Sequence, residues 1–375
     1  MDNSRKPKIF LATGGSGGHI FPAISVAREL IKQNCKIWVI ADKVFEKYTS
    51  GDISYRIISA GKTLKSFSDI KEIIKGIFYA KKLIKSKKPD LVIAFGSYAS
   101  LPTLIACKLT KTPFVIHEQN SYIGKVNKLF AKYSMGVMTS YHELYGINFD
   151  DMEKIIYTGT PIRKDIQKLY DKEYSLPKDN EKFVVLITGG SGGAKIFSDL
   201  LPQIFDLQHK EQQKKIKIYH QVREQYLIKT KEYYKKINVE ASVSTFFPNM
   251  DELLEKAHLI IGRSGSGTLN ETAIAGKPSI LIPLKNSANN HQELNAKIYA
   301  KNGAGIVILE DKFNVRNFQE LFFNLIKDKE RLQEMAKKAR SIAVADADIK
   351  IVNVVKDIVK KIIEEKNNKK NEGKN

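Results

Sequence analysis

The sequence predicts an α/β protein of two halves, each a parallel β-sheet with helices packed against it. The hexapeptide Thr-Gly-Gly-Ser-Gly-Gly stands at residues 13–18 and recurs identically at residues 188–193. A compact apolar run precedes each copy, at residues 9–12 and 183–187, and a helical pattern follows the first. Strand, glycine turn and helix form the unit of nucleotide-binding sheets, so the chain repeats a half rather than a short module.

The remaining strands are predicted from short apolar runs that alternate with helical segments. Such runs have the length and composition of strands buried in a parallel sheet. They lie at residues 36–41, 91–95, 114–117, 216–220, 259–261, 279–282 and 305–308. Residues 158–161 offer a break between the halves, and apolar residues at helical spacing from 349 to 362 mark a last helix before the polar tail 366–375. A ligand is expected in the cleft between the two domains, outside the carboxyl ends of the strands.

The composition is typical of a soluble globular protein, and the net charge limits the classes of partner that the chain can bind. Its 62 Lys and Arg exceed its 41 Asp and Glu, and the net charge of +21 suits nucleic acid, an anionic membrane or a phosphorylated substrate. Cys35 and Cys107 lie in apolar segments, which excludes a disulfide framework and favours a reducing cytoplasm. The apolar run at residues 9–12 is too short for a signal peptide. No recognised nucleic-acid-binding module is present.

The first glycine loop, residues 14–18, is predicted to bind a phosphate or pyrophosphate. Glycines let backbone N–H groups approach an anion, and the start of the following helix, where Pro22 stands, adds a partial positive charge. The dehydrogenase fingerprint is excluded because Ile20 stands where its third glycine is required, and the chain has no Walker A sequence. His19 follows the loop directly, so it is either a general base or a residue that braces the loop.

Other polar residues gather at the predicted strand ends and helix starts. A third loop, residues 262–268, can neutralise a diphosphate leaving group without a metal. Glu271 lies about one turn into the next helix, where it either accepts hydrogen bonds from a sugar diol or simply favours the helix dipole. Residues 117–120, His-Glu-Gln-Asn, close a strand. Gln292 and Asn295 share a helix face and either hold sugar hydroxyls or form exposed surface.

One segment is a candidate for membrane binding, and another resembles a metal-binding motif. Residues 62–88 combine many lysines with Phe and Ile side chains at mostly helical spacing. This helix either lies on anionic lipid or packs one face on the core and solvates its lysines. Residues 346–348, Asp-Ala-Asp, imitate a metal-binding motif, but they precede the last helix, so Asp348 is expected to be its N-cap. No metal site is predicted.

Taken together, the motifs resemble those of the MurG family of bacterial cell-wall glycosyltransferases, and they occur in the family order. They are residues 13–19, 117–120, 159–163, 189–191, 263–265 and 291–295. The resemblance implies the GT-B fold, in which two Rossmann-like domains face a central cleft and the last helix returns to the N-terminal domain. The implied domains are residues 1–163 with 345–375, on the acceptor and membrane side, and residues 164–344, which bind UDP-GlcNAc.

The resemblance also implies the reaction and the site. Enzymes of the family transfer GlcNAc from UDP-GlcNAc to the muramyl 4-hydroxyl of lipid I, with inversion of configuration at the anomeric carbon. The product is lipid II, an intermediate of peptidoglycan synthesis. His19 is the candidate base, and no cofactor or metal is implied. The implied substrate-binding residues are Ser16, Gly17, Gly18, Asn120, Arg163, Ser191, Phe247, Ser266, Gly267, Thr268, Glu271 and Gln292. Ser97 and Leu101 replace glycines of the loop that the family is thought to use for the acceptor diphosphate.

The implied partners are UDP-GlcNAc, lipid I and an anionic membrane surface, without nucleic acid. The implied location is peripheral, on the cytoplasmic face of the inner membrane. Two alternatives stay open at this point. One is a GT-B transferase that uses another lipid acceptor, and the other is a non-catalytic protein that binds a nucleotide sugar or nucleic acid.

Overall fold

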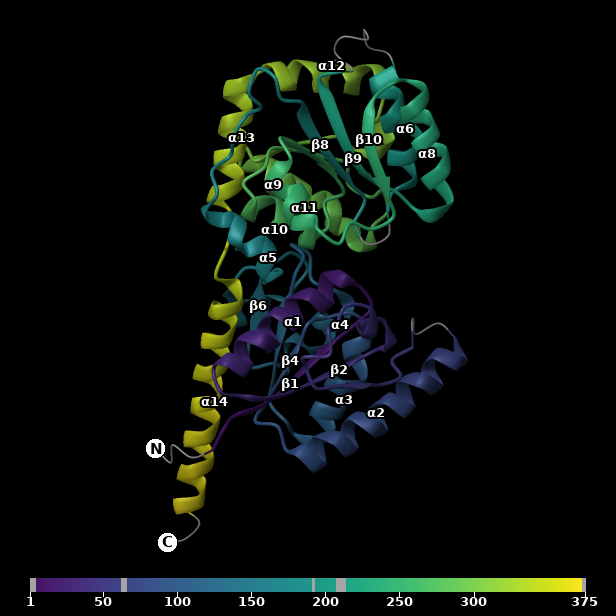
Figure 1. Ribbon diagram of the computed structural model, residues 1–375. Helices are drawn as coiled ribbons and strands as arrows, with labels where there is room; N and C mark the ends of the chain where they lie inside the picture. Colours follow the sequence, from purple (N-terminus) through teal and green to yellow (C-terminus); the bar gives the residue numbers. More distant parts are fainter. Residues whose placement is uncertain (1–4, 62–65, 191–192, 207–213, 373–375) are drawn as a thin grey trace. The chain divides into compact units, whose positions relative to one another are not determined.

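The computed structural model describes residues 5–61, 66–190, 193–206 and 214–372. The chain forms two compact units, which Figure 1 shows coloured along the sequence. Unit 1 comprises residues 1–163 and 346–375, and unit 2 comprises residues 164–345.

Unit 1 is built on a seven-stranded parallel sheet in the order β3-β2-β1-β4-β5-β6-β7. Its strands are β1 (Lys8–Thr13), β2 (Lys36–Ala41), β3 (Tyr55–Ile57), β4 (Leu91–Ala94), β5 (Phe114–Glu118), β6 (Val137–Thr139) and β7 (Ile155–Tyr157). Because side chains alternate along a strand, Ile9 and Leu11 of β1 face one core cluster and Phe10 and Ala12 face the other. A sheet buried on both faces explains the continuous apolar runs of its central strands.

Helices cover both faces of this sheet. The long α1 (Gly17–Lys32) and α14 (Ala347–Glu372) pack on the Ile9 face, and α2 (Phe67–Lys87), α3 (Leu101–Thr110) and α4 (Lys125–Ala131) contribute to the core on the Phe10 face. The C-terminal helix therefore returns to the N-terminal half, as expected. Short 3-10 helices complete the unit: η1 (Lys43–Lys47), η2 (Tyr98–Ser100) and η3 (Phe149–Lys154).

Unit 2 is built on a six-stranded parallel sheet in the order β10-β9-β8-β11-β12-β13. Its strands are β8 (Phe183–Thr188), β9 (Ile216–Gln221), β10 (Glu240–Ser244), β11 (Leu259–Gly262), β12 (Ser279–Leu281) and β13 (Gly305–Val307). Its α-helices are α5 (Lys164–Gln167), α6 (Lys195–Asp206), α8 (Leu227–Lys236), α9 (Met250–Lys256), α10 (Ser266–Ile274), α11 (His291–Lys301), α12 (Val315–Lys327) and α13 (Lys329–Ser341). Its short 3-10 helices are η4 (Lys168–Asp171), η5 (Glu224–Tyr226), η6 (Ala288–Asn290) and η7 (Glu310–Lys312).

Every strand predicted from an apolar run is present, and the prediction of two parallel α/β sheets is confirmed. The sequence did not reveal β3, β6 and β7, each of three residues, or β10, the polar edge strand Glu-Ala-Ser-Val-Ser. Such strands carry too few buried apolar residues to show a period, so their neighbours in the sheet define them.

The helix ends differ from the sequence-based expectation in three places. Helix α1 begins at Gly17, so Pro22 lies inside it, and the end of the glycine loop forms its first turn. Helix α10 begins at Ser266, whereas the apolar pattern of the sequence predicts helix over residues 269–275. Helix α14 continues through the polar tail to Glu372, and Asp348 lies within its first turn, so the N-cap assignment of Asp348 was wrong.

No helix within the described ranges is both long enough and apolar enough to cross a membrane.

Candidate functional site

Both glycine loops follow the strand at which the order of the sheet reverses. In unit 1, β1 lies between β2 and β4, and in unit 2, β8 lies between β9 and β11. The helices that follow neighbouring strands then leave on opposite faces, which opens a crevice at the carboxyl end of the central strand. Each unit therefore presents its glycine loop where open α/β sheets bind ligands.

Positive φ angles shape the first loop. Gly14 has φ +149° and Gly15 has φ +78°, and a Cβ at Gly14 would lie 2.5 Å from the Cβ of Ala99. The N–H of Gly15 donates to Asp42 Oδ2 at 2.8 Å, and Asp42 Oδ1 caps the N–H of Val44. Asp42, which stands where dehydrogenases place a ribose-binding acid, therefore braces the loop.

The first turn of α1 carries Gly17, Gly18 and His19. The first N–H groups of a helix have no partner within it, so this turn presents donors and a partial positive charge. Ser16 is the N-cap residue of α1, and its side chain makes no capping bond there. This geometry suits an anion at the loop.

His19 is half-buried, and its ring is held by the ends of two neighbouring strands. Its Nδ1 lies 2.8 Å from the carbonyl oxygen of Phe95, after β4, and 2.9 Å from Oε1 of Gln119, after β5. The His19 ring is thus held through Nδ1 by two oxygens, and Nε2 is the other ring nitrogen. The sequence did not indicate the role of Gln119.

Residues His117 and Glu118 are fully enclosed beneath this site. Burial lowers the pKa of His117 to about 4; its bond to Gly159 O opposes that shift and the charge of His19 adds to it. The Glu118 carboxylate accepts the N–H of Asn120 at 3.0 Å through Oε1, and Asn127 Nδ2 at 2.8 Å through Oε2. Glu118 thereby fixes the turn that carries Asn120.

Arg163, the last residue of unit 1 before the chain enters unit 2, packs on helix α1. Its guanidinium lies 4.9 Å from the ring centroid of Phe21, one turn beyond Gly17. The aromatic face steadies the cation close to the start of α1.

In unit 2 the second glycine loop and the start of α10 lie together. A Cβ at Gly190 would be 4.0 Å from Thr268 Oγ1, and one at Gly262 would be 3.7 Å from Thr268 Cγ2. The residues Ser266, Gly267 and Thr268 form the first turn of α10, so their backbone N–H groups are presented at its positive end. Ser191 lies outside the described residues.

The loop between β11 and α10 is held by residues of α11. Ser264 Oγ donates to the carbonyl of Gln292 at 2.7 Å, and Asn295 Nδ2 donates to the carbonyl of Ser264 at 3.2 Å. Asn295 is fully buried, which corrects the idea that it holds a sugar: it positions the loop. Gln292 is half-buried, and its Oε1 accepts the N–H of Leu284 at 3.0 Å, which orients its amide.

Other residues that the sequence predicts to bind the sugar donor also lie at the carboxyl ends of the strands of unit 2. Glu271 is half-buried on the second turn of α10. Phe247 follows β10, is buried, and packs edge-on against Tyr219 of β9. Arg263 turns away from the loop: its buried guanidinium donates to the carbonyl of Ile282 and to Glu310 Oε2 at 2.8 Å. Arg263 is thus a structural brace.

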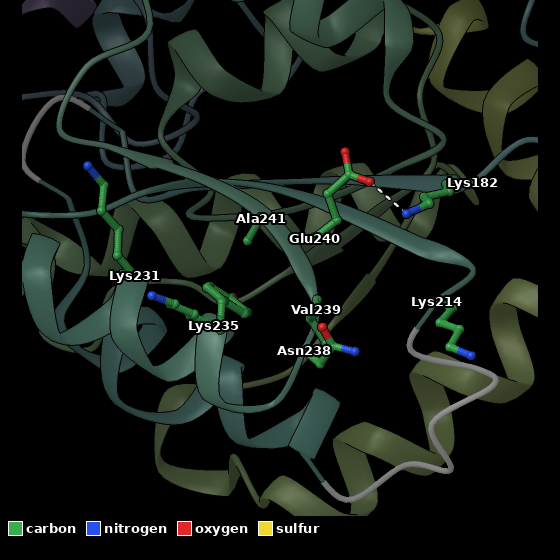
Figure 2. A pocket seen from close by; sticks show the side chains of 9 residues that line it. Lys182, Lys214, Lys231, Lys235, Asn238, Val239, Glu240 and Ala241 are labelled. Carbon is green, nitrogen blue, oxygen red and sulfur yellow. Dashed lines mark hydrogen bonds and ion pairs between the residues drawn. The ribbon is translucent and has the colours of Figure 1, made fainter.

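A lysine-lined pocket of unit 2 lies at the opposite end of the strands. Figure 2 shows Lys182, Lys231, Lys235 and Glu240 among the side chains that line it, and the Glu240 carboxylate pairs with Lys182 at 2.6 Å. Because β8 begins at Phe183 and β10 at Glu240, this pocket is at the amino ends of the strands, away from the glycine loop.

Within the described ranges, no three His, Cys, Asp or Glu side chains lie close enough together to hold a metal ion.

Two parallel α/β units with glycine loops at their switch points form a scaffold of the kind that binds nucleotides, and comparison with known families gives the class of the protein. The glycosyltransferase family 28 N-terminal domain matches residues 9–139, and the family 28 C-terminal domain matches residues 184–351. The chain is a glycosyltransferase.

Individual relatives narrow the class. The chain is 32% identical over 352 residues to the UDP-N-acetylglucosamine–N-acetylmuramyl-(pentapeptide) pyrophosphoryl-undecaprenol N-acetylglucosamine transferase of Phenylobacterium zucineum, covering 92% of this chain and 96% of that protein. It is 33% identical to the protein of the same name from Caulobacter vibrioides, covering 92% and 97%. The crystal structure of Acinetobacter baumannii MurG matches with a TM-score of 0.75 at 27% identity, over 94% of this chain and 99% of that one. The chain belongs to the MurG family.

Proposed function

We propose that this protein transfers GlcNAc from UDP-GlcNAc to the muramyl 4-hydroxyl of lipid I and releases lipid II and UDP. The observation that carries the proposal is His19, a braced histidine on the first turn of α1 beside a phosphate-type loop, in a chain that spans nearly the whole length of named transferases. A general base next to an anion site is what glycosyl transfer to a hydroxyl requires.

Unit 2 supplies the donor site in this proposal. The N–H groups at the start of α10 bind the diphosphate and stabilise the charge that develops as UDP leaves. Glu271 accepts hydrogen bonds from the ribose hydroxyls, the backbone at Phe247 meets the uracil, and Gln292 binds the GlcNAc hydroxyls. The residues assigned to the donor are Ser191, Phe247, Ser266, Gly267, Thr268, Glu271 and Gln292.

Unit 1 supplies the base and the acceptor site. Nε2 of His19 takes the proton of the muramyl 4-hydroxyl as its oxygen attacks the anomeric carbon of GlcNAc. The new bond joins that oxygen to the anomeric carbon, the bond from this carbon to the UDP oxygen breaks, and a single displacement inverts the configuration. Ser16, Gly17 and Gly18 form the loop beside the reacting groups, Asn120 reaches the GlcNAc, and Arg163 adds positive charge near the diphosphate.

We also propose that α2 holds the protein on the cytoplasmic face of the inner membrane. Phe67 is 86% exposed, Phe78 69% and Ile74 47%, so large apolar side chains project from α2 among exposed lysines such as Lys71 and Lys75. A helix of this composition enters the lipid interface with its apolar side chains while its lysines meet anionic headgroups. The core-packing alternative is confirmed for one face of this helix, because Ile73, Gly76, Ala80 and Ile84 are buried. The lipid contact of the outer face is the proposal.

Turnover with defined substrates tests the enzyme proposal. Incubation of the chain with sugar-labelled UDP-GlcNAc and a lipid I analogue should give labelled lipid II. Transfer to another lipid acceptor, or UDP-GlcNAc hydrolysis alone, would favour a different GT-B transferase, and binding without turnover would favour a non-catalytic protein. For His19→Ala we expect turnover to fall by about 100-fold or more, the usual contribution of a general base, with UDP-GlcNAc affinity retained. Unchanged turnover would remove His19 from the chemistry.

Vesicle sedimentation tests the membrane proposal. The double variant Ile74→Ser, Phe78→Ser should bind anionic vesicles more weakly than the native chain. Ile349→Ser is the matched control, because Ile349 is 43% exposed but lies on α14. Ile77 is left in place because it packs on the core. Equal binding by a folded double variant would show that α2 is a core helix with a solvated outer face.

A further inference from the structure

The hydrogen-bonding partners of His19 determine which ring nitrogen carries its proton. Nδ1 faces two oxygens, the Phe95 carbonyl at 2.8 Å and Gln119 Oε1 at 2.9 Å. The Phe95 carbonyl can only accept, so Nδ1 must be the protonated nitrogen. A neutral imidazole with its proton on Nδ1 has a lone pair on Nε2, which is the form that a general base needs.

The side-chain amide of Gln119 has only one orientation that satisfies its neighbours. Its nitrogen lies 3.0 Å from the Phe95 carbonyl and 3.0 Å from His117 Nδ1. If the amide were turned over, its oxygen would face the Phe95 carbonyl, and two acceptors would meet in a buried place. The nitrogen therefore donates on this side, and Oε1 is left to face His19.

His117 completes the chain of hydrogen bonds. Its Nε2 lies 2.9 Å from the carbonyl of Gly159, so Nε2 carries a proton and donates. Full burial keeps the ring neutral, because it lowers the pKa of His117 to about 4. The unprotonated Nδ1 of His117 then accepts from Gln119, and its tautomer is opposite to that of His19.

We propose that Gln119 is a positioning residue that links two histidines of opposite tautomer, so that the His19 ring is held with an unprotonated Nε2 for the acceptor hydroxyl. The inference rests on the proposed function for the identity of that hydroxyl, but the hydrogen bonds themselves do not depend on it. The order of donation is from His117 to Gly159, from Gln119 to His117, and from His19 to Gln119.

This arrangement also favours the product of proton transfer. When Nε2 takes a proton, the imidazolium places its Nδ1–H against two oxygens, Phe95 O and Gln119 Oε1. Acceptors at that position stabilise the positive ring and fix its orientation, which is how an acceptor behind a catalytic histidine contributes to general base catalysis. His117 takes no part in the reaction and keeps Gln119 from turning over.

Nuclear magnetic resonance of the native full-length chain tests the proposal without any loss of folding. With ¹⁵N-labelled histidine and glutamine, above the pH at which ordinary histidines titrate, His19 should show its proton on Nδ1 and His117 on Nε2. A scalar coupling across the hydrogen bond should join Gln119 Nε2 to His117 Nδ1. Assignment among the seven histidines uses His19→Gln and His117→Asn spectra. A His19 proton on Nε2, or no coupling from Gln119, would overturn the proposal.

Kinetics give a second and independent test. Gln119→Met should lower kcat by roughly 10-fold with KM for UDP-GlcNAc unchanged, because His19 keeps only one of its two acceptors. Gln319→Met is the matched control, since the Gln319 amide donates to a backbone carbonyl of unit 2, that of Ile204, and should leave kcat unchanged. His117→Asn, whose oxygen can accept from Gln119, should retain more activity than His117→Leu. Equal kcat for native and Gln119→Met would refute the role of Gln119.

The two proposals fail in different ways. If the native chain makes no lipid II, the tautomers of His19 and His117 still test the hydrogen-bond arrangement. If lipid II forms but the tautomers are reversed, the role of Gln119 and the proton transfer to Nε2 of His19 are lost, while the transferase activity stands.

Discussion

Gly76 lies in the middle of α2, and replacing it with alanine should destabilise the protein even though alanine favours a helix. A Cβ at Gly76 would lie 1.9 Å from the backbone oxygen of Ser59 and 3.1 Å from the Cβ of Pro102 on α3. The Ser59 atom belongs to the main chain, so it cannot rotate away as a flexible side chain would. Either α2 or the segment that carries Ser59 must move.

The magnitude follows from two opposing contributions. Glycine to alanine within a helix gains about 1 kcal/mol of helix propensity. Overpacking a well-packed contact costs about 1–3 kcal/mol, and a clash with backbone belongs at or above the upper end. We expect a net loss of about 2 kcal/mol, or roughly 4–8 °C in Tm for a unit of this size.

Thermal unfolding followed by circular dichroism is the assay. Ser86→Ala is the matched control on the same helix, because Ser86 is exposed and its replacement should leave Tm unchanged or slightly higher. A Tm for Gly76→Ala equal to or above the native value would show that the close approach of α2 to Ser59 is not a packing constraint.

Three further predictions concern a strained loop residue, a buried histidine and the proposed ribose contact. Ser97 has φ +67° and ψ 159°, a region that favours glycine, so Ser97→Gly should raise the free energy of unfolding in urea by about 1 kcal/mol. Burial lowers the pKa of His220 to about 3, whereas the pKa in the unfolded chain is near 6.5. As the pH falls below 6.5, the unfolded chain takes up a proton that the folded chain does not, so the folded state loses stability. Between pH 7 and pH 5 the free energy of unfolding of the native chain should therefore fall by about 2 kcal/mol more than that of His220→Asn. Parallel curves of this free energy against pH would contradict the prediction. Glu271→Gln should raise KM for UDP-GlcNAc by roughly 10-fold or more with kcat little changed, since a charged acceptor for the ribose is lost; an unchanged KM would exclude that contact.

The glycine loops and the strands before them were predictable because their signals are local. A buried parallel strand is a short apolar run, and the loop after it needs residues that tolerate positive φ, as Gly14 and Gly15 do. The same local rules misplaced the start of α1 and α10, because the first turn of each helix consists of loop-like residues such as Gly17 and Gly267. A helix start is decided by its hydrogen bonds, which composition does not reveal.

The roles of single polar residues were less predictable, because they depend on partners far along the chain. Asn295 has the sequence position of a sugar-binding residue, but Ser264 and full burial make it a support for a loop. Arg263 stands in a phosphate-type loop, but its guanidinium bonds to Ile282 and Glu310. No short-range pattern distinguishes a residue that meets a ligand from one that holds the loop in place.

The sequence by itself determined two parallel sheets, the strand ends that carry the glycine loops, and His19 as the candidate base, because apolar periodicity and glycine spacing act over a few residues. Only the tertiary structure decided that Gln119 and Phe95 face the same nitrogen of His19, and that Gly76 must be a glycine. Those facts depend on residues that lie far apart in the chain and meet only when neighbouring strands and helices pack, where a hydrogen bond or a clash is set by a few tenths of an ångström.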